Sequence, residues 1–130
     1  MRHFKLDEVA GVTINQQINE RRIKLLASPV SDVRREQFSV GVSIVEPGKV
    51  HEEHAHDGSE ELIVVIGGEG WAKIAGQEFA IGYGSVIDID RGEPHGFVNT
   101  GRSPLVLLWI YDPPGAERKF SGGRTKEGTA

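Results

Sequence analysis

The sequence predicts an all-β protein that folds as a sandwich or barrel. From Arg35 onward the chain is a succession of short apolar segments that alternate with turn residues. The turn signals are frequent, since the chain has 17 Gly and 6 Pro, and they divide the sequence into strand-length pieces instead of long helices. Many short strands at close spacing are typical of β-sandwiches and barrels.

The expected strands differ in how they are buried. Gln37–Val45 has an apolar residue at every second position, which indicates a half-buried strand. Glu61–Ile66 is, after Glu61, a continuous apolar run rich in β-branched residues, which suits a strand buried on both faces. The other expected strands are Val50–His56, Trp71–Ala75, Glu78–Ile81, Ser85–Ile89, Gly96–Asn99 and Leu105–Tyr111. A hairpin loop is expected at Gly76-Gln77.

The two ends of the chain differ from this pattern. Ile14–Leu26 is consistent with a helix or with a pair of strands, and a strand is favoured for Arg22–Ala27. Residues 1–34 are therefore treated as an N-terminal segment and residues 35–114 as a single barrel. Residues 115–130 are polar with one aromatic residue, Phe120, and predict a flexible C-terminal tail.

Composition excludes several classes of protein. The chain has no Cys, so disulfides, thiolate metal sites and cysteine nucleophiles are ruled out. Its net charge of -4 does not favour binding to a nucleic-acid backbone. No apolar run approaches the roughly 20 residues that span a bilayer, and the first residues lack the apolar core of a signal peptide. We therefore expect a cytoplasmic protein that binds neither nucleic acid nor membrane.

A cluster of histidines indicates a metal site. His54 and His56 are two residues apart, so in a strand they would project to the same face. The turn that follows them returns a strand beginning with Glu60-Glu61, and His95 is a plausible fourth ligand. Two imidazoles and one carboxylate suit a first-row transition metal. A His-x-His pair in an exposed loop is more often merely solvated, so this spacing alone leaves both interpretations open.

Two spaced motifs resemble those of the cupin superfamily. The first is Gly48-x5-His54-x-His56-x4-Glu61-x6-Gly68, and the second is Gly84-x5-Asp90-x-Gly92-x2-His95-x3-Asn99. The family pattern usually has Pro where this chain has Asp90, a departure that concerns a turn and removes no ligand. The 15 residues Glu69–Tyr83 separate the motifs, a short spacing that is typical of small single-domain members.

The resemblance implies a fold and a ligand set. The fold is a cupin-type antiparallel β-barrel, also called a double-stranded β-helix or jelly roll. The ligand set is His54, His56, Glu61 and His95, which would hold one divalent transition metal per chain. Glu61 is preferred to Glu60 because six residues then separate it from Gly68, and Glu60 should face the other side of the sheet. Fe, Mn, Ni, Zn and Cu all accept such ligands.

Other motif residues have structural interpretations. The glycines Gly48, Gly68, Gly84 and Gly92 fall at strand ends, where positive φ or close backbone approach is needed. Asn99 is expected to hydrogen-bond a turn.

Candidate pocket residues are assigned from strand alternation. Phe97 follows His95 by two residues and should face the same cavity, and Trp109 or Tyr111 could line its mouth, although core packing is the favoured interpretation for each of the three. Strict alternation places Glu52 on the ligand face, whereas a β-bulge would turn His51 there instead. Either one could act as a general acid or base, or lie on a solvated edge.

These features predict a metal-dependent enzyme that acts on a small polar molecule. Four protein ligands on an octahedral ion leave two positions open for a substrate or dioxygen. The reaction could be dioxygenase-like, or that of an isomerase, lyase or decarboxylase. The alternative is a module that binds a small molecule or metal without catalysis. The resemblance also implies a homodimer, with residues 1–34 as an arm that exchanges N-terminal strands.

Overall fold

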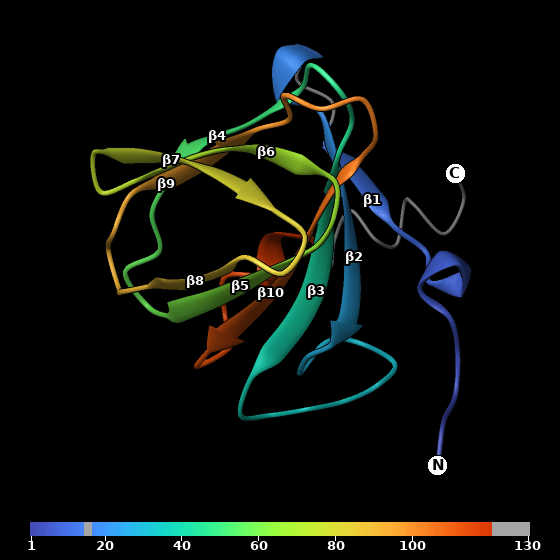
Figure 1. Cartoon of the computed structure of the whole chain (residues 1–130). Coiled ribbons are helices and arrows are strands. Elements are labelled where there is room, and N and C mark those ends of the chain that lie inside the picture. The colour runs from blue at the N-terminus through green and yellow to red at the C-terminus, as the bar shows by residue number, and fades with distance from the viewer. Residues whose placement is uncertain (15–16, 121–130) are drawn as a thin grey trace.

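The computed structural model describes residues 1–14 and 17–120 as two antiparallel sheets that face each other (Figure 1). One sheet has six strands in the order β1 (Val12–Ile14), β2 (Arg21–Ala27), β3 (Ser39–Val45), β10 (Leu105–Asp112), β5 (Glu60–Gly67) and β8 (Val86–Ile89). The other has four in the order β4 (Val50–His54), β9 (His95–Val98), β6 (Glu69–Ile74) and β7 (Gln77–Gly82). The all-β jelly-roll prediction is confirmed.

Helical structure is sparse in the described part of the chain. It consists of two 3-10 turns, η1 (Leu6–Glu8) and η2 (Gln17–Asn19), and a helical segment at 118–120. Within those residues, no helix has the length and apolar composition that a membrane crossing requires.

The N-terminal region forms a pair of strands, which is one of the two structures that its sequence allowed. β1 pairs with β2 in antiparallel register, with Val12 opposite Ile23, and β2 continues the sheet by pairing with β3. The helical alternative for Ile14–Leu26 is therefore wrong, although residues 15–16 lie outside the described residues. The two strands extend the six-stranded sheet, because Ile23 and Leu25, two residues apart on β2, pack into the core.

The core lies between the two sheets, and close packing around Trp109 limits which residues can stand beside it. The Trp109 indole N–H donates to Ser43 Oγ at 3.0 Å, which satisfies a polar group that is otherwise buried. A Cβ at Gly41 would lie 2.2 Å from Cζ2 of the same indole, so only glycine fits opposite this ring. The large aromatic residue and the glycine are thus a matched pair across β3 and β10.

The β6–β7 hairpin turns one residue earlier than expected. Its two central residues are Ala75 and Gly76, with φ of 49° and 83°. Positive φ at both positions is the geometry of the tight hairpin turn whose twist matches that of the strands. The pairing of Ile74 with Gln77 places Ala75 in the turn, although non-glycine residues disfavour positive φ. The expected loop at Gly76-Gln77 is therefore wrong by one position.

The motif glycines and Asn99 have the structural roles expected of them. All four glycines have positive φ, and at Gly68 a Cβ would also lie 2.3 Å from the Pro104 carbonyl oxygen. The Asn99 side-chain amide donates to the carbonyls of Val45 and Ser103, each at 2.8 Å, and its oxygen accepts from the Gly101 N–H. These residues shape the strand ends that hold the two motifs.

The first residues of the expected C-terminal tail pack onto the barrel. Phe120 is 5% exposed and belongs to the core cluster, and Glu117 is completely buried. The Glu117 carboxylate accepts hydrogen bonds from Ser39 Oγ and from the Gly115 N–H, both at 2.7 Å. The prediction of a flexible tail is therefore wrong for residues 115–120, because the polar side chain finds buried partners that composition does not reveal. Residues 121–130 lie outside the described residues.

Candidate metal centre

The four predicted ligands converge at one point between the sheets. One donor atom from each of His54, His56, Glu61 and His95 can be chosen so that all lie within 4.8 Å of one another. Glu61 Oε1 is 3.0 Å from His95 Nε2 and 3.6 Å from His56 Nε2. Glu61 belongs to the six-stranded sheet and His95 to the four-stranded sheet, so the site forms only when the barrel closes.

His54 and His56 meet for a different reason from the one expected. β4 ends at His54, and His56 lies beyond it in the turn to β5, so strand alternation does not place the pair. Their rings are nevertheless 4.7 Å apart between centroids, because the turn folds His56 back toward the strand end. The expected strand Val50–His56 is thus too long by two residues.

The choice between the two adjacent glutamates follows from alternation on β5. Glu61 is 5% exposed and faces the histidines, whereas Glu60 is exposed on the opposite face. This placement agrees with the expectation that Glu61, and not Glu60, belongs to the site.

Backbone carbonyls orient two of the imidazoles. His95 Nδ1 lies 2.8 Å from the Glu93 carbonyl oxygen, and His54 Nδ1 lies 3.0 Å from that of Glu52. A carbonyl oxygen only accepts hydrogen bonds, so in each ring Nδ1 carries the proton and Nε2 keeps a free lone pair in the neutral form. This is the outer contact that usually fixes a metal-binding histidine.

The electrostatics fit a cation at the point of convergence. His56 Nε2, His95 Nε2 and Glu61 Oε1 are buried, and none has a hydrogen-bond partner among the described residues. Burial lowers the pKa of His54 to about 3 and that of His56 to about 4, so both are neutral donors near pH 7. Burial also disfavours the charged form of His95, but the adjacent Glu61 carboxylate outweighs it and raises the pKa of His95. A divalent ion would satisfy every one of these atoms.

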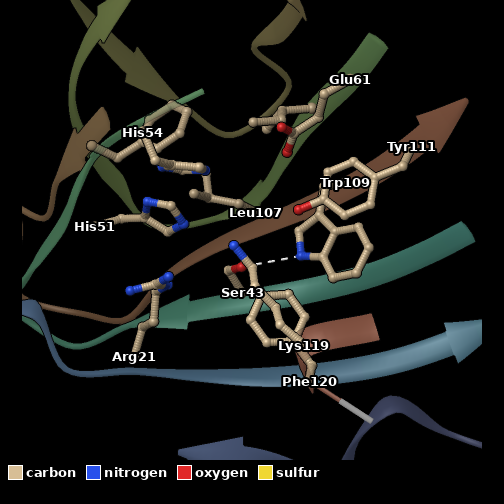
Figure 2. Close-up of a pocket in the computed structure, with 12 residues that line it drawn as sticks. Arg21, Ser43, His51, His54, Glu61, Leu107, Trp109, Tyr111, Lys119 and Phe120 are labelled. Carbon is tan, nitrogen blue, oxygen red and sulfur yellow. Dashed lines mark hydrogen bonds between the residues drawn. The ribbon is translucent and has the colours of Figure 1, made fainter. Parts of the chain in front are cut away.

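A pocket adjoins this centre and includes all three predicted aromatic residues. Phe97, Trp109 and Tyr111 are 2%, 2% and 4% exposed, and each both lines the pocket and packs in the core. Figure 2 shows the Tyr111 hydroxyl pointing into the pocket, and burial raises the pKa of that hydroxyl well above 10. The space is small, since the centre of a water molecule can move within about 10 Å³.

The structure separates the two candidate acid–base residues. The β4–β9 register shifts between His51 and His54, and this bulge turns His51 into the pocket while Glu52 is exposed. His51 lies 4.4 Å from His54 between ring centroids, and burial lowers its pKa well below 6.5. The placement of Glu52 on the ligand face is therefore wrong, because an inserted residue reverses the alternation.

Sequence reasoning missed six residues that line the pocket: Arg21, Ser43, Ile63, Leu107, Lys119 and Phe120. Arg21 and Lys119 lie outside both motifs and come from the two ends of the chain (Figure 2). No spacing rule connects Arg21 or Lys119 to the histidines. Their positions depend on how β2 and the helical segment at 118–120, here called the C-terminal turn, pack on the barrel. Arg91, the arginine within the second motif, is exposed and does not line the pocket.

Comparison with known proteins identifies relatives of this fold. The family model described as a cupin domain matches residues 41–111. An uncharacterised protein of Methanocaldococcus jannaschii is 32% identical over 76 residues, which are 58% of this chain and 61% of that protein. The match thus spans less than two thirds of that relative's length.

Two solved structures show the same architecture. A predicted oxalate decarboxylase from Thermotoga maritima superposes with a TM-score of 0.75 at 23% identity, over 87% of this chain and all of that one. A putative sugar phosphate isomerase from Acidithiobacillus ferrooxidans gives a TM-score of 0.68 at 21% identity, over 84% and 71% of the two chains. At these identities the likeness is one of fold.

Proposed function

The chain belongs to the cupin family, and from that premise we propose that it is a metal-dependent enzyme that acts on a small polar molecule. The observation that supports the proposal best is the convergence of four donor side chains, three of whose buried atoms have no hydrogen-bond partner among the described residues. Buried polar atoms are rarely left unsatisfied without a functional reason. A bound divalent ion is the partner that fits three imidazoles and a carboxylate.

In this proposal His54, His56, Glu61 and His95 hold one divalent transition metal per chain. When bound, such an ion supplies Lewis acidity toward a substrate oxygen or, as Fe(II), a site for dioxygen. Each histidine offers a neutral nitrogen and Glu61 offers a negative charge, so a dipositive ion would keep a net charge of about +1 in the site. That remaining charge favours a substrate with an electron-rich oxygen.

Two pocket residues are suited to handle a proton or a hydrogen bond. Tyr111 keeps its proton because burial raises its pKa well above 10, so its hydroxyl can donate to a substrate oxygen. His51 is neutral, and its Nδ1 lies 3.3 Å from the Glu52 carbonyl oxygen, which leaves Nε2 as an acceptor. We propose Tyr111 as the donor and His51 as the acceptor. Glu52 has no such role here because its side chain is exposed.

The reaction class is tested by separating oxygen-dependent from oxygen-independent chemistry. The structures of a predicted oxalate decarboxylase and a putative sugar phosphate isomerase share the fold, and both oxygen-dependent and oxygen-independent reactions are therefore tested. We would reconstitute the protein separately with Fe(II), Mn(II), Ni(II) and Zn(II), then assay small hydroxy acids, keto acids and sugars in air and under argon. Turnover under argon supports isomerase, lyase or decarboxylase chemistry, whereas oxygen uptake with Fe(II) alone supports a dioxygenase.

The alternative is a module that binds a small molecule or metal without turning it over. The observation that favours it is the small cavity, which Phe120 and Lys119 line from the C-terminal turn. Saturable binding of a compound by the metal-loaded protein, with no product formed under either atmosphere, would support this alternative. Failure of every metal to bind would contradict the metal-dependent enzyme and the metal-binding form of the alternative.

A further inference from the structure

We infer that the ligand of this pocket is a small carboxylate, which Arg21 binds from β2 and Lys119 binds from the C-terminal turn. The inference rests on the proposed metal-dependent function and specifies the chemical class of its substrate. Its starting observation is that two cationic side chains from opposite ends of the chain line the same pocket as two of the four donors, His54 and Glu61 (Figure 2).

Arg21 is a cation without a full set of partners. Its Nε is buried and has no hydrogen-bond partner among the described residues. The guanidinium makes one long hydrogen bond, from Nη1 to the Asn19 carbonyl oxygen at 3.5 Å. No carboxylate of residues 1–14 or 17–120 lies within ion-pair distance of it. A half-buried guanidinium left in this state is costly, which a bound anion would correct.

Lys119 brings a second positive charge to the same space. It lies on the helical segment at 118–120, and its side chain lines the pocket together with that of Phe120. The buried Glu117 carboxylate accepts a hydrogen bond from Ser39 of the barrel. This bond holds the backbone that carries Lys119 in place. Lys119 likewise has no ion-pair partner among the described residues, and burial together with the charge of Arg21 lowers its pKa.

The lining of the pocket carries one more positive than negative side chain, and Glu52 and Glu117 lie outside the lining but within electrostatic range of Arg21 and Tyr111 respectively. Among its lining residues Arg21 and Lys119 are positive and Glu61 is the one carboxylate. Glu61 is already engaged with the histidines, at 3.0 Å from His95 and 3.6 Å from His56. A metal ion would add further positive charge. An excess of positive over negative charge in a cavity favours ligands that carry negative charge.

The shape of the pocket favours a carboxylate over larger anions. A planar guanidinium binds a planar carboxylate through two parallel hydrogen bonds, which a neutral amide cannot match. The space is small and Phe97, Trp109 and Tyr111 form its other walls, so the carbon skeleton must be short. A phosphate ester is tetrahedral and larger, and its preferential binding is an outcome that the experiment below must exclude.

The test compares charged and neutral probes of the same shape on the metal-loaded protein. We would load the protein with Mn(II) and titrate formate, pyruvate and malonate, their amides, and inorganic phosphate, by calorimetry and water-proton relaxation. We expect at least one carboxylate to bind about 10-fold or more tightly than its amide and than phosphate. Arg21→Gln should remove this preference, Arg21→Lys should retain part of it, and the matched control Arg91→Gln should leave it unchanged.

The outcomes separate this inference from the proposed function. Equal binding of acids and amides, tighter binding of phosphate, or no binding of any carboxylate would overturn the inference while Mn(II) stays bound. Loss of Mn(II) from the unmodified protein would instead contradict the metal-dependent function. Should Arg21→Gln not fold, as judged by circular dichroism, Lys119→Gln on the exposed turn should weaken the same carboxylate by several-fold, and an unchanged affinity would count against the inference.

Discussion

His95 Nε2 and Glu61 Oε1 lie 3.0 Å apart in side chains that are 1% and 5% exposed, and neither atom has a hydrogen-bond partner among the described residues. The two residues belong to different sheets, so barrel closure brings an imidazole and a carboxylate together in a buried place. Two such atoms are poorly satisfied by each other alone. Their arrangement fits the proposal that both residues would bind one cation.

Removal of either ligand should release the metal. We expect His95→Ala and Glu61→Gln each to lower metal affinity by more than about 10–100-fold, which is the loss seen when only a residue that orients a ligand is changed. Elemental analysis after dialysis against a weak chelator would measure retention. Glu60→Gln is the matched control, because Glu60 is exposed on the opposite face of β5, and a loss of metal from this variant would contradict the assignment.

The metal-free protein should lose stability as the pH falls below neutral. The pKa values of His54 and His56 are about 3 and 4 in the folded chain, below the value of about 6.5 for an unfolded histidine. Between these values the unfolded state binds more protons, so acidification from about pH 7 to about pH 5 lowers the free energy of unfolding. His95 acts oppositely, since its raised pKa stabilises the fold below about pH 6.5 and this contribution is lost as the pH rises.

Urea unfolding in the presence of a chelator, at several pH values, would measure this dependence. The pKa of the buried His51 is also lowered, so His51, like His54 and His56, makes the fold less stable as the pH falls. Three histidines thus act in this direction and His95 alone acts against it. We expect His54→Asn to give a shallower pH dependence than the unmodified chain. Stability that rises on acidification of the metal-free protein would contradict the neutral state of these histidines.

The convergence of the four donor side chains was predictable from the sequence to the extent that local rules and motif spacing determine it. The two motifs place His54, His56, Glu61 and His95 correctly in relation to one another, and alternation on β5 distinguishes Glu61 from Glu60. The bulge that turns His51 inward depends on an inserted residue in the β4–β9 pairing, which alternation alone cannot reveal. Nor can any local pattern show which side chains enter from distant parts of the chain.

The fold was predictable because hydrophobic alternation is local, and the segments it describes least well lie at the two ends of the chain. Strand rhythm and turn residues identify the barrel strands to within one or two residues, since hydrophobic alternation is a local signal. The segment that carries Glu117 and Phe120 has a polar composition, and its burial depends on contacts with residues far away in the sequence. Arg21 and Lys119 were missed on the same account.

A methyl group at Gly41 should destabilise the core. The added Cβ would lie 2.2 Å from the Trp109 ring, and neither the ring nor the strand can yield without losing its packing. We expect Gly41→Ala to lower the free energy of unfolding by about 1–3 kcal/mol, as overpacked cores do. Gly82→Ala is the matched control, because a Cβ there meets no atom within 4 Å. Equal unfolding midpoints in urea for the two variants would contradict this account of the Gly41–Trp109 contact.

Loss of the Glu117 carboxylate should free the C-terminal turn. Glu117→Ala leaves Ser39 Oγ and the Gly115 N–H without their acceptor, which should cost about 1–3 kcal/mol of stability. We also expect faster proteolysis after Lys119, measured by limited digestion and mass spectrometry. Glu117→Gln keeps an acceptor oxygen and should retain part of the stability. Identical digestion of Glu117→Ala and the unmodified chain would show that this contact does not hold the turn.

We propose that the protein is a homodimer, and the outer face of the six-stranded sheet is the surface that favours pairing. Cross-strand partners on this face are apolar on four neighbouring strands, as at Ile44–Val106, Leu62–Ile110 and Val64–Val86. Leu62, Ile66 and Val86 are 37%, 38% and 64% exposed. Exposed apolar side chains gathered on one face often mark an interface, and a second copy offers the same surface by symmetry.

Charges on this face should separate the two copies without unfolding either one. We expect the unmodified protein to elute as a dimer at micromolar concentration, and the double variant Leu62→Lys/Val86→Lys to elute as a monomer in size-exclusion chromatography with light scattering. Trp71→Lys is the control, because Trp71 is 42% exposed on the four-stranded sheet. A monomeric unmodified protein would refute the dimer. A dimer that persists in the double variant would shift the interface to residues 1–34, because exchange of the N-terminal strands does not require the apolar face.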